Sequence, residues 1–167
     1  MNKEKTIAAL FDFDGVVMDT EAQYTKFWDA IGNVYYPEIE NFGHHIKGQS
    51  LKELYKNYFG ETEGLQDYIT GKLLEFEEQI HFEYIAGAAA FMKSLKERGV
   101  KIAIVTSSSD SKMANAYRAH PELLTMTDCI VTADRVTHSK PHPECFLLGA
   151  EMLGVEKDNC IVFEDSF

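Results

Sequence analysis

Short apolar runs alternate with segments of helical periodicity along most of the chain. The runs lie at residues 7–13, 100–105, 129–131 and 160–163. Continuous apolar runs of this length are typical of strands in a parallel sheet that is covered on both faces. Apolar residues three and four positions apart, followed by Gly99 and Gly154, predict helices over residues 88–95 and 146–153. This alternation predicts an α/β fold with a doubly wound, Rossmann-like parallel sheet.

The stretch between the first two runs interrupts this alternation. It is about 80 residues long, whereas a crossover between parallel strands needs about a dozen. Three groups of apolar residues share helical faces: Tyr24, Phe27, Trp28 and Ile31; Leu51, Leu54, Tyr55 and Tyr58; Leu65, Ile69, Leu73, Phe76 and Ile80. Ser50 and Glu53 form a capping-box pattern before the second group. We therefore expect a helical domain at residues 19–85, inserted into an α/β core of residues 1–18 and 86–167.

Composition and charge restrict the classes of function. With 167 residues and 45% hydrophobic residues, the chain can bury one substantial core. The 16 basic and 27 acidic residues give a net charge of −11, which argues against a nucleic-acid partner. Three cysteines without CxxC spacing suit reduced thiols, and the N-terminal apolar run is too short for a signal peptide or a membrane span. We expect a cytoplasmic protein without a membrane partner.

Polar residues follow each of the four runs. Asp12, Asp14 and Gly15 end the first run, Thr106 the second, and Glu164 and Asp165 the fourth, while Lys140 follows the third at some distance. A period of two places the Asp12 and Asp14 carboxylates on the same side of a strand. Each motif alone is ordinary: solvated strand ends, helix N-caps or a surface lysine. In a parallel sheet, however, the carboxyl ends of strands line one ligand crevice.

The convergence of these residues predicts a site for a phosphorylated ligand. Four carboxylates in one crevice repel one another unless some are protonated or a cation lies among them, and oxygen-only ligands favour Mg²⁺. Lys140 and the Thr106 hydroxyl would bind the oxygens of the transferring group. The six histidines show no metal-ligand spacing in the sequence, so we expect most of them at the surface or in the inserted helical domain.

In their order, these motifs resemble the haloacid dehalogenase (HAD) superfamily of phosphatases and phosphomutases. The matching segments are Asp12-Phe-Asp14-Gly15-Val-Val-Met-Asp19-Thr20, the strand ending in Thr106, Lys140-Pro-His-Pro143-Glu-Cys-Phe146 and Glu164-Asp165-Ser166. Within the superfamily the chain is similar to the β-phosphoglucomutase-like branch, which carries a helical cap after the first motif. The resemblance covers nearly the whole chain.

The resemblance implies a role for each matching residue. Asp12 would be the nucleophile and Asp14 the general acid and base, with Thr106 and Lys140 completing the catalytic set. Metal ligands would be Asp12, Asp14 through its backbone carbonyl, Glu164 and Asp165, holding Mg²⁺. Phosphate and substrate would contact Gly15, Thr20, Tyr24, Gly48, Ser50, Ser107 and Ser108, and Trp28 would also face the cleft.

Departures from the family pattern keep alternatives open. Tyr24 and Leu51 stand where β-phosphoglucomutase has a histidine and an arginine, which favours simple hydrolysis of small phosphorylated metabolites, such as sugar phosphates, over a phosphohexomutase.

Family members continue with a turn, a helix and a fifth strand, so a chain ending at Phe167 is expected to lack the last strand and helix of the core and to expose its fourth run. A truncated, inactive phosphate-binding module is the alternative of another class. We expect a monomer or weak dimer.

Overall fold

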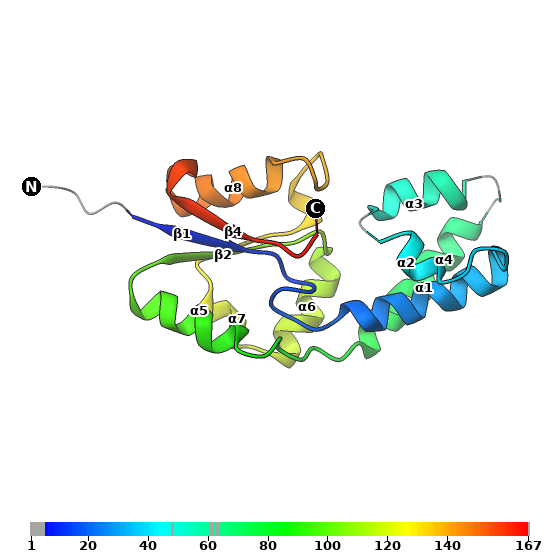
Figure 1. Cartoon of the computed structure of the whole chain (residues 1–167), viewed down its shortest axis with the longest axis horizontal. Coiled ribbons are helices and arrows are strands. Elements are labelled where there is room, and N and C mark those ends of the chain that lie inside the picture. The colour runs from blue at the N-terminus through cyan, green and yellow to red at the C-terminus, as the bar shows by residue number, and fades with distance from the viewer. Residues whose placement is uncertain (1–5, 48, 61, 63, 167) are drawn as a thin grey trace, which may run out of the picture. The chain divides into compact units, whose positions relative to one another are not determined.

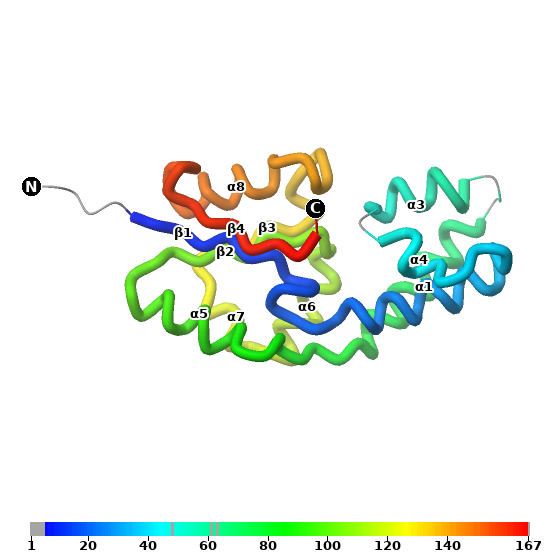
Figure 2. Tube along the Cα trace, viewed as in Figure 1, coloured from blue at the N-terminus to red at the C-terminus, as the bar shows by residue number. Residues whose placement is uncertain are grey.

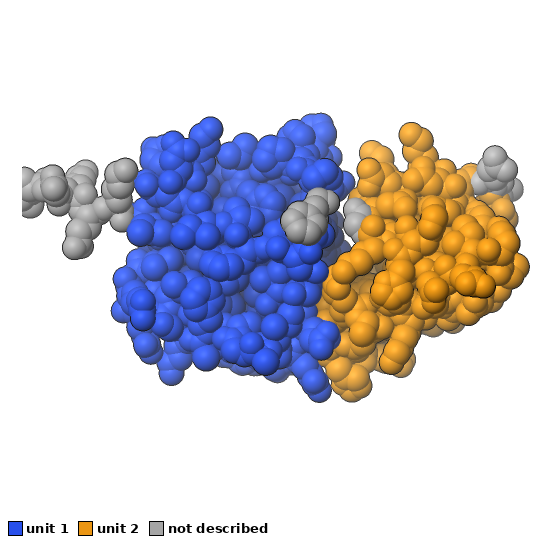
Figure 3. Space-filling model, in the orientation of Figure 1, with its two compact units in different colours: residues 1–19, 82–167 blue, residues 20–81 orange. Residues whose placement is uncertain are grey.

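The chain divides into two compact units. The computed structural model describes residues 6–47, 49–60, 62 and 64–166. Unit 1 comprises Met1–Asp19 and Phe82–Phe167, and unit 2 comprises Thr20–His81 (Figure 3).

Unit 1 is built on a parallel sheet of four strands in the order β3-β2-β1-β4. The strands are β1 (Ala8–Phe11), β2 (Lys101–Val105), β3 (Cys129–Val131) and β4 (Cys160–Phe163). Their positions and parallel pairing confirm the predicted α/β fold. The register pairs Phe11 with Ile104 on one side and with Phe163 on the other. The carboxyl ends of these three strands therefore lie side by side.

Helices cover both faces of this sheet. Helix α8 (Glu144–Leu153) lies on one face, while α5 (Ala88–Glu97), α6 (Asp110–Ala119) and the short α7 (Leu123–Met126) lie on the other (Figures 1 and 2). Two 3₁₀ turns, at Ala133–Arg135 and Lys157–Asn159, complete the unit. The core under α8 contains buried side chains from three strands, from that helix and from the turn after it: Ala8, Leu10, Ala103, Val105, Val131, Cys145 and Val155.

Two features of the sheet bear on the site: the point where β1 ends and the exposure of β4. β1 ends at Phe11, two residues earlier than the apolar run predicts, and a tight turn follows in which the Gly15 N–H donates to the Met18 carbonyl at 2.9 Å. β4 is an edge strand, and its Ile161 and Val162 are 57% and 44% exposed. The exposure expected for the fourth run is therefore observed.

Unit 2 consists of helices α1 (Glu21–Tyr35), α2 (Phe42–His45), α3 (Leu51–Tyr58) and α4 (Leu65–Gln79). The three predicted helices are confirmed, whereas the four-residue α2 was not expected. The capping box is also present: the Ser50 side chain accepts from the Glu53 N–H, and the Glu53 carboxylate accepts from the Ser50 N–H. The core of the unit contains Phe42, Ile46, Leu54, Phe59 and Ile69.

None of the helices in the described part of the chain has the length and apolar character needed to cross a membrane.

Candidate active site

A lysine contacts two carboxylates beyond the carboxyl ends of β1 and β4. The Lys140 Nζ lies 2.8 Å from Asp12 Oδ1 and 2.6 Å from Glu164 Oε2. Asp12 continues the strand ladder for one residue, because its N–H donates to the Phe163 carbonyl at 2.9 Å. The Lys140 ammonium also lies 4.9 Å from the centre of the Phe146 ring. Asp12, Lys140 and Glu164 therefore lie together, as the sequence predicts.

Burial and charge act in opposite directions on these groups. Burial raises the pKa of Asp12 to about 7, although Lys140 acts to lower it and Glu164 to raise it. Burial also favours the protonated form of Glu164, but hydrogen bonds from Lys140 and Ser166 hold the pKa of Glu164 below its usual range. Burial works against the charge on Lys140, yet Asp12 and Glu164 together raise the pKa of Lys140. Asp12 is thus the group with the most strongly perturbed pKa in the cluster.

Asp165 brings a third carboxylate to the same place. Asp12, Glu164 and Asp165 each offer an oxygen, and these oxygens all lie within 4.8 Å of one another. Gly15, with φ of +79°, makes room for this approach: a Cβ atom there would stand 2.5 Å from Asp165 Oδ2. Three carboxylates beside a glycine turn give an oxygen-only donor set, which fits Mg²⁺. We call Asp12, Glu164 and Asp165 the carboxylate group.

The Asp14 side chain has different partners. Its Oδ1 lies 2.5 Å from Lys112 Nζ, and its Oδ2 accepts from the Ser108 hydroxyl at 2.7 Å. Among the described residues, the carboxylate group within 4.8 Å does not include Asp14. The strand alternation that would align the Asp12 and Asp14 side chains stops at Phe11. The prediction that all four carboxylates share one crevice stays a prediction. The prediction that the Asp14 backbone carbonyl binds a metal is a separate one and stays a prediction.

The segment after β2 carries the predicted anion site. Thr106 is buried, and its hydroxyl accepts from the Ser108 N–H at 3.0 Å. Ser107 is exposed. Ser109 is the N-cap of α6, where its side chain accepts from the Lys112 N–H. Thr106 and Ser108 thus shape the turn that precedes α6, and their roles in binding phosphate stay predictions.

The predicted substrate residues of the cap belong to unit 2. Thr20 is buried at the start of α1. The Tyr24 hydroxyl donates to Glu77 Oε1 at 2.7 Å, which links α1 to α4, and Trp28 packs against the core of the unit. Ser50 caps α3, as described above. Gly48 lies outside the described residues.

Lys112 is the residue of this site that sequence reasoning missed. Only 2% of it is exposed, although it is a lysine on a helix. Lys112 and Ala116 are four positions apart and therefore share the buried face of α6. A lysine on an apolar helical face was the available signal, because a buried ammonium needs an anionic partner.

Comparison with known proteins identifies the family. Residues 8–167 match the haloacid dehalogenase-like hydrolase family. The chain therefore belongs to this family and is an enzyme of the hydrolase class, as the resemblance predicts.

Relatives within the family include phosphatases and phosphomutases. The chain is 30% identical to hexitol phosphatase A of Escherichia coli, over 94% of this chain and 73% of that protein. It is 29% identical to a phosphorylated carbohydrates phosphatase of Thermotoga maritima, over 95% of this chain and 76% of that protein. The crystal structure of β-phosphoglucomutase from Clostridium difficile shares the fold, with a TM-score of 0.73 and 23% identity, covering 96% of this chain and 77% of that one.

Proposed function

We propose that the protein is a magnesium-dependent phosphatase of small phosphorylated metabolites, with sugar or polyol phosphates as the substrate class. The observation that carries the proposal is Lys140, which contacts both Asp12 and Glu164 beside the third carboxylate of Asp165. Phosphatase names among the relatives support the substrate class.

The reaction proceeds in two displacements on the Asp12 carboxylate. A carboxylate oxygen of Asp12 attacks phosphorus, a bond forms between that oxygen and phosphorus, and the bond from phosphorus to the substrate alcohol breaks. Asp14 gives its proton to the departing alkoxide. Asp14 then takes a proton from water, the water oxygen attacks phosphorus, and the Asp12–phosphorus bond breaks to release inorganic phosphate.

The other residues bind and orient the phosphoryl group. Lys140 offsets negative charge on Asp12 and on the phosphate, and Thr106 and Ser107 donate to phosphoryl oxygens. Asp12, Glu164 and Asp165 would hold Mg²⁺, with the Asp14 backbone carbonyl as a further ligand. When bound, Mg²⁺ supplies positive charge that neutralises the phosphoryl oxygens and favours the ionised form of Asp12.

We further propose that unit 2 acts as the substrate-covering cap. Its contributions would come from Thr20, Tyr24, Gly48 and Ser50, while Gly15 and Ser108 belong to unit 1. Opening and closing of a cap would admit substrate and exclude bulk water. We place the enzyme in the cytoplasm as a monomer or weak dimer, and its three free cysteines are consistent with a reducing compartment.

A phosphohexomutase is the second candidate. The Tyr24 hydroxyl is engaged with Glu77 within unit 2, and Leu51 is an apolar residue, 38% exposed. Neither side chain offers the cationic charge that would hold the second phosphate of a bisphosphate intermediate. These observations favour hydrolysis.

A phosphate-release assay tests the proposal. The full chain is incubated with Mg²⁺ and a panel of hexose and hexitol phosphates, beside Asp12→Asn and the matched control Asp158→Asn, which changes an exposed aspartate. We expect phosphate release by the wild type and the control, and a loss of about a thousandfold or more in kcat for D12N. Mass spectrometry after an acid quench should find a phosphoryl group on the peptide that contains Asp12.

Three results would contradict the proposal. Interconversion of sugar 1- and 6-phosphates with little free phosphate would identify a mutase. No release from any member of the panel would support the inactive phosphate-binding module. Equal activity of D12N and D158N would exclude Asp12 as the nucleophile.

A further inference from the structure

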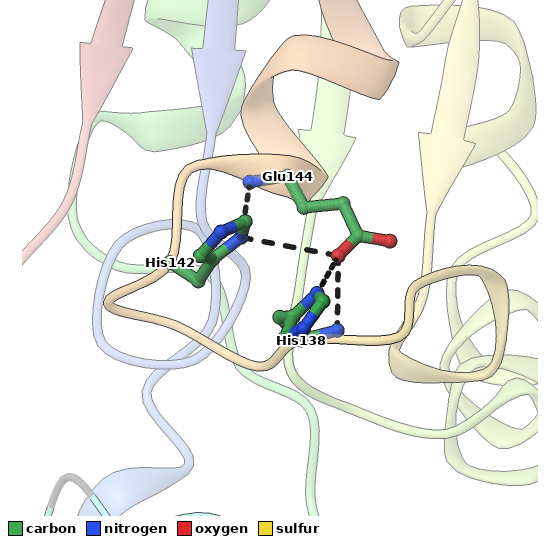
Figure 4. A group of neighbouring side chains, drawn as sticks. All are labelled: His138, His142 and Glu144. Atoms are coloured by element: carbon green, nitrogen blue, oxygen red, sulfur yellow. Dashed lines mark hydrogen bonds and ion pairs between the residues drawn. The ribbon is translucent and has the colours of Figure 1, made fainter.

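We propose that His138, His142 and Glu144 form a second metal site, selective for a zinc-class transition-metal cation. The two histidines lie on the segment between β3 and α8, and Glu144 begins α8. Nδ1 of both imidazole rings approaches the same carboxylate oxygen of Glu144 (Figure 4). The proposal concerns residues outside the catalytic set and does not depend on the proposed function.

The distances between the ligand atoms suit a small cation. Glu144 Oε2 lies 2.7 Å from His138 Nδ1 and 3.8 Å from His142 Nδ1. Two ligands of a tetrahedral Zn²⁺ ion are roughly 3.3 Å apart, given Zn–N bonds of about 2.0–2.1 Å. The two measured separations lie on either side of that value. Shifts of well under 1 Å in exposed side chains would therefore bring these atoms to zinc-ligand spacing.

Backbone hydrogen bonds already position the carboxylate. Glu144 Oε1 accepts from the Thr137 N–H at 2.8 Å, and Oε2 accepts from the His138 N–H at 3.0 Å. These bonds and the hydrogen bond with the His138 ring lower the pKa of Glu144 to about 2, so the carboxylate is ionised at neutral pH. The Glu144 N–H in turn donates to His142 Nδ1 at 3.3 Å. A cation on His142 Nδ1 would replace this long bond, whereas the two N–H bonds to Glu144 can remain. Because those two bonds already fix the carboxylate, part of the entropy cost of assembling three ligands has been met before a cation binds.

The two imidazole rings are close and accessible. Their centroids are 4.5 Å apart, and the His138 and His142 side chains are 63% and 51% exposed. The rings can turn without disturbing a packed core, and a cation can reach them from solvent. Three protein ligands leave a fourth position for water.

The donor set determines the class of cation. Imidazole nitrogen suits Zn²⁺, Co²⁺, Ni²⁺ and Cu²⁺, whereas Mg²⁺ prefers oxygen ligands. This site therefore differs in chemistry from the carboxylate group, which offers oxygen only. Lys140 lies between the two histidines in the sequence, so a bound cation would hold the segment that presents this lysine.

A cobalt titration tests the site directly. The full chain is freed of metal, placed in excess Mg²⁺ to occupy the carboxylate group, and titrated with Co²⁺ while its visible absorption is followed. We expect one equivalent of Co²⁺ to give a ligand-field band, and Zn²⁺ to displace it.

Variants assign the ligands. His138→Ala/His142→Ala should bind Co²⁺ at least about 10-fold more weakly, and Glu144→Gln should also weaken binding. The matched control His44→Ala/His81→Ala removes two exposed imidazoles from unit 2 and should bind as the wild type does. Circular dichroism checks that each variant is folded, and the single variant His142→Ala serves if the double variant is not.

Two outcomes would overturn the proposal. The first is a wild type that shows no cobalt band at millimolar Co²⁺; His138 and Glu144 are then an ion pair only. The second is equal binding by a folded H138A/H142A variant and the wild type, which places the cation elsewhere.

Discussion

At the residue scale, the two aspartates of the first motif have separate environments. Asp12 is buried beside Lys140 and Glu164, whereas Asp14 is half-buried between Lys112 and Ser108. Two carboxylates with different partners can take different roles in acid–base and nucleophilic chemistry. The separation suits a nucleophile and a proton donor that act in turn.

In the metal-free protein, ionisation of Asp12 should lower the free energy of unfolding as the pH rises above the acidic range. Its pKa is raised to about 7 in the folded state, from an ordinary value of 3.8. The folded state thus binds more protons than the unfolded state between those values, so stability decreases as pH rises from about 4 to 7. We expect Asp12→Asn to be more stable than the wild type by up to about 4 kcal/mol at pH 8, and equally stable below pH 4.

Urea unfolding at pH 4, 6 and 8 in a chelator measures this difference. Asp158→Asn is the control and should show no such dependence on pH. A constant difference between D12N and the wild type across the range would contradict the prediction.

Lys112 should act as a positioning residue for Asp14. Replacement by Met removes the buried ammonium and leaves the Asp14 carboxylate with Ser108. We expect Lys112→Met to lower kcat by about 10- to 100-fold with little change in KM, since general acid–base catalysis contributes about 10²–10⁴. Steady-state kinetics on the identified substrate measures the split, and Lys112→Arg should restore part of kcat. A change in KM alone would contradict this role.

At the element scale, the N-terminus of α3 depends on Ser50. Its hydroxyl accepts from the Glu53 N–H, and the Glu53 carboxylate accepts from the Ser50 N–H at 2.9 Å. Helix α3 has only eight residues, so such a cap is a large part of its local stability.

Replacing the cap should destabilise unit 2. We expect Ser50→Ala to cost about 1 kcal/mol, and Ser50→Asp to retain most of the stability because Asp is also a good N-cap. Denaturation followed by the fluorescence of Trp28, the single tryptophan, reports on this unit. The exposed Ser111→Ala variant is the control. Equal stability of S50A and wild type would show that the box contributes nothing.

At the scale of the whole molecule, the carboxylate group belongs entirely to unit 1. Asp12, Glu164 and Asp165 come from the two connections that leave β1 and β4. A cation that links them joins segments about 150 positions apart in the sequence. Binding of Mg²⁺ should therefore stabilise unit 1 first.

Hydrogen exchange with and without Mg²⁺ tests this expectation. We expect slower exchange in residues 8–18 and 160–166, and little change in residues 20–81. At 100 times the dissociation constant the stabilisation should be about 2.7 kcal/mol. The Asp165→Asn variant should lose the effect. Protection confined to residues 20–81 would contradict a metal site in unit 1.

Local patterns made most of the fold predictable. Apolar runs and helical spacing, with Gly99 and Gly154 as stops, located the four strands and most of the helices. The short α2 and α7 escaped because four residues are too few to show a period. β1 was predicted too long because Phe13 is buried in the turn after the strand, where an apolar residue gives no sign of the strand's end.

The sequence by itself determined the α/β class, the inserted helices and the set of residues at the strand ends, because these depend on hydrophobic period and local capping. Only the tertiary structure decided which side chains meet. It paired Asp14 with Lys112, joined Tyr24 to Glu77 and brought His138 and His142 to Glu144. Such pairings depend on strand register, turn geometry and burial, which join distant or irregular segments and leave no periodic signal in the chain.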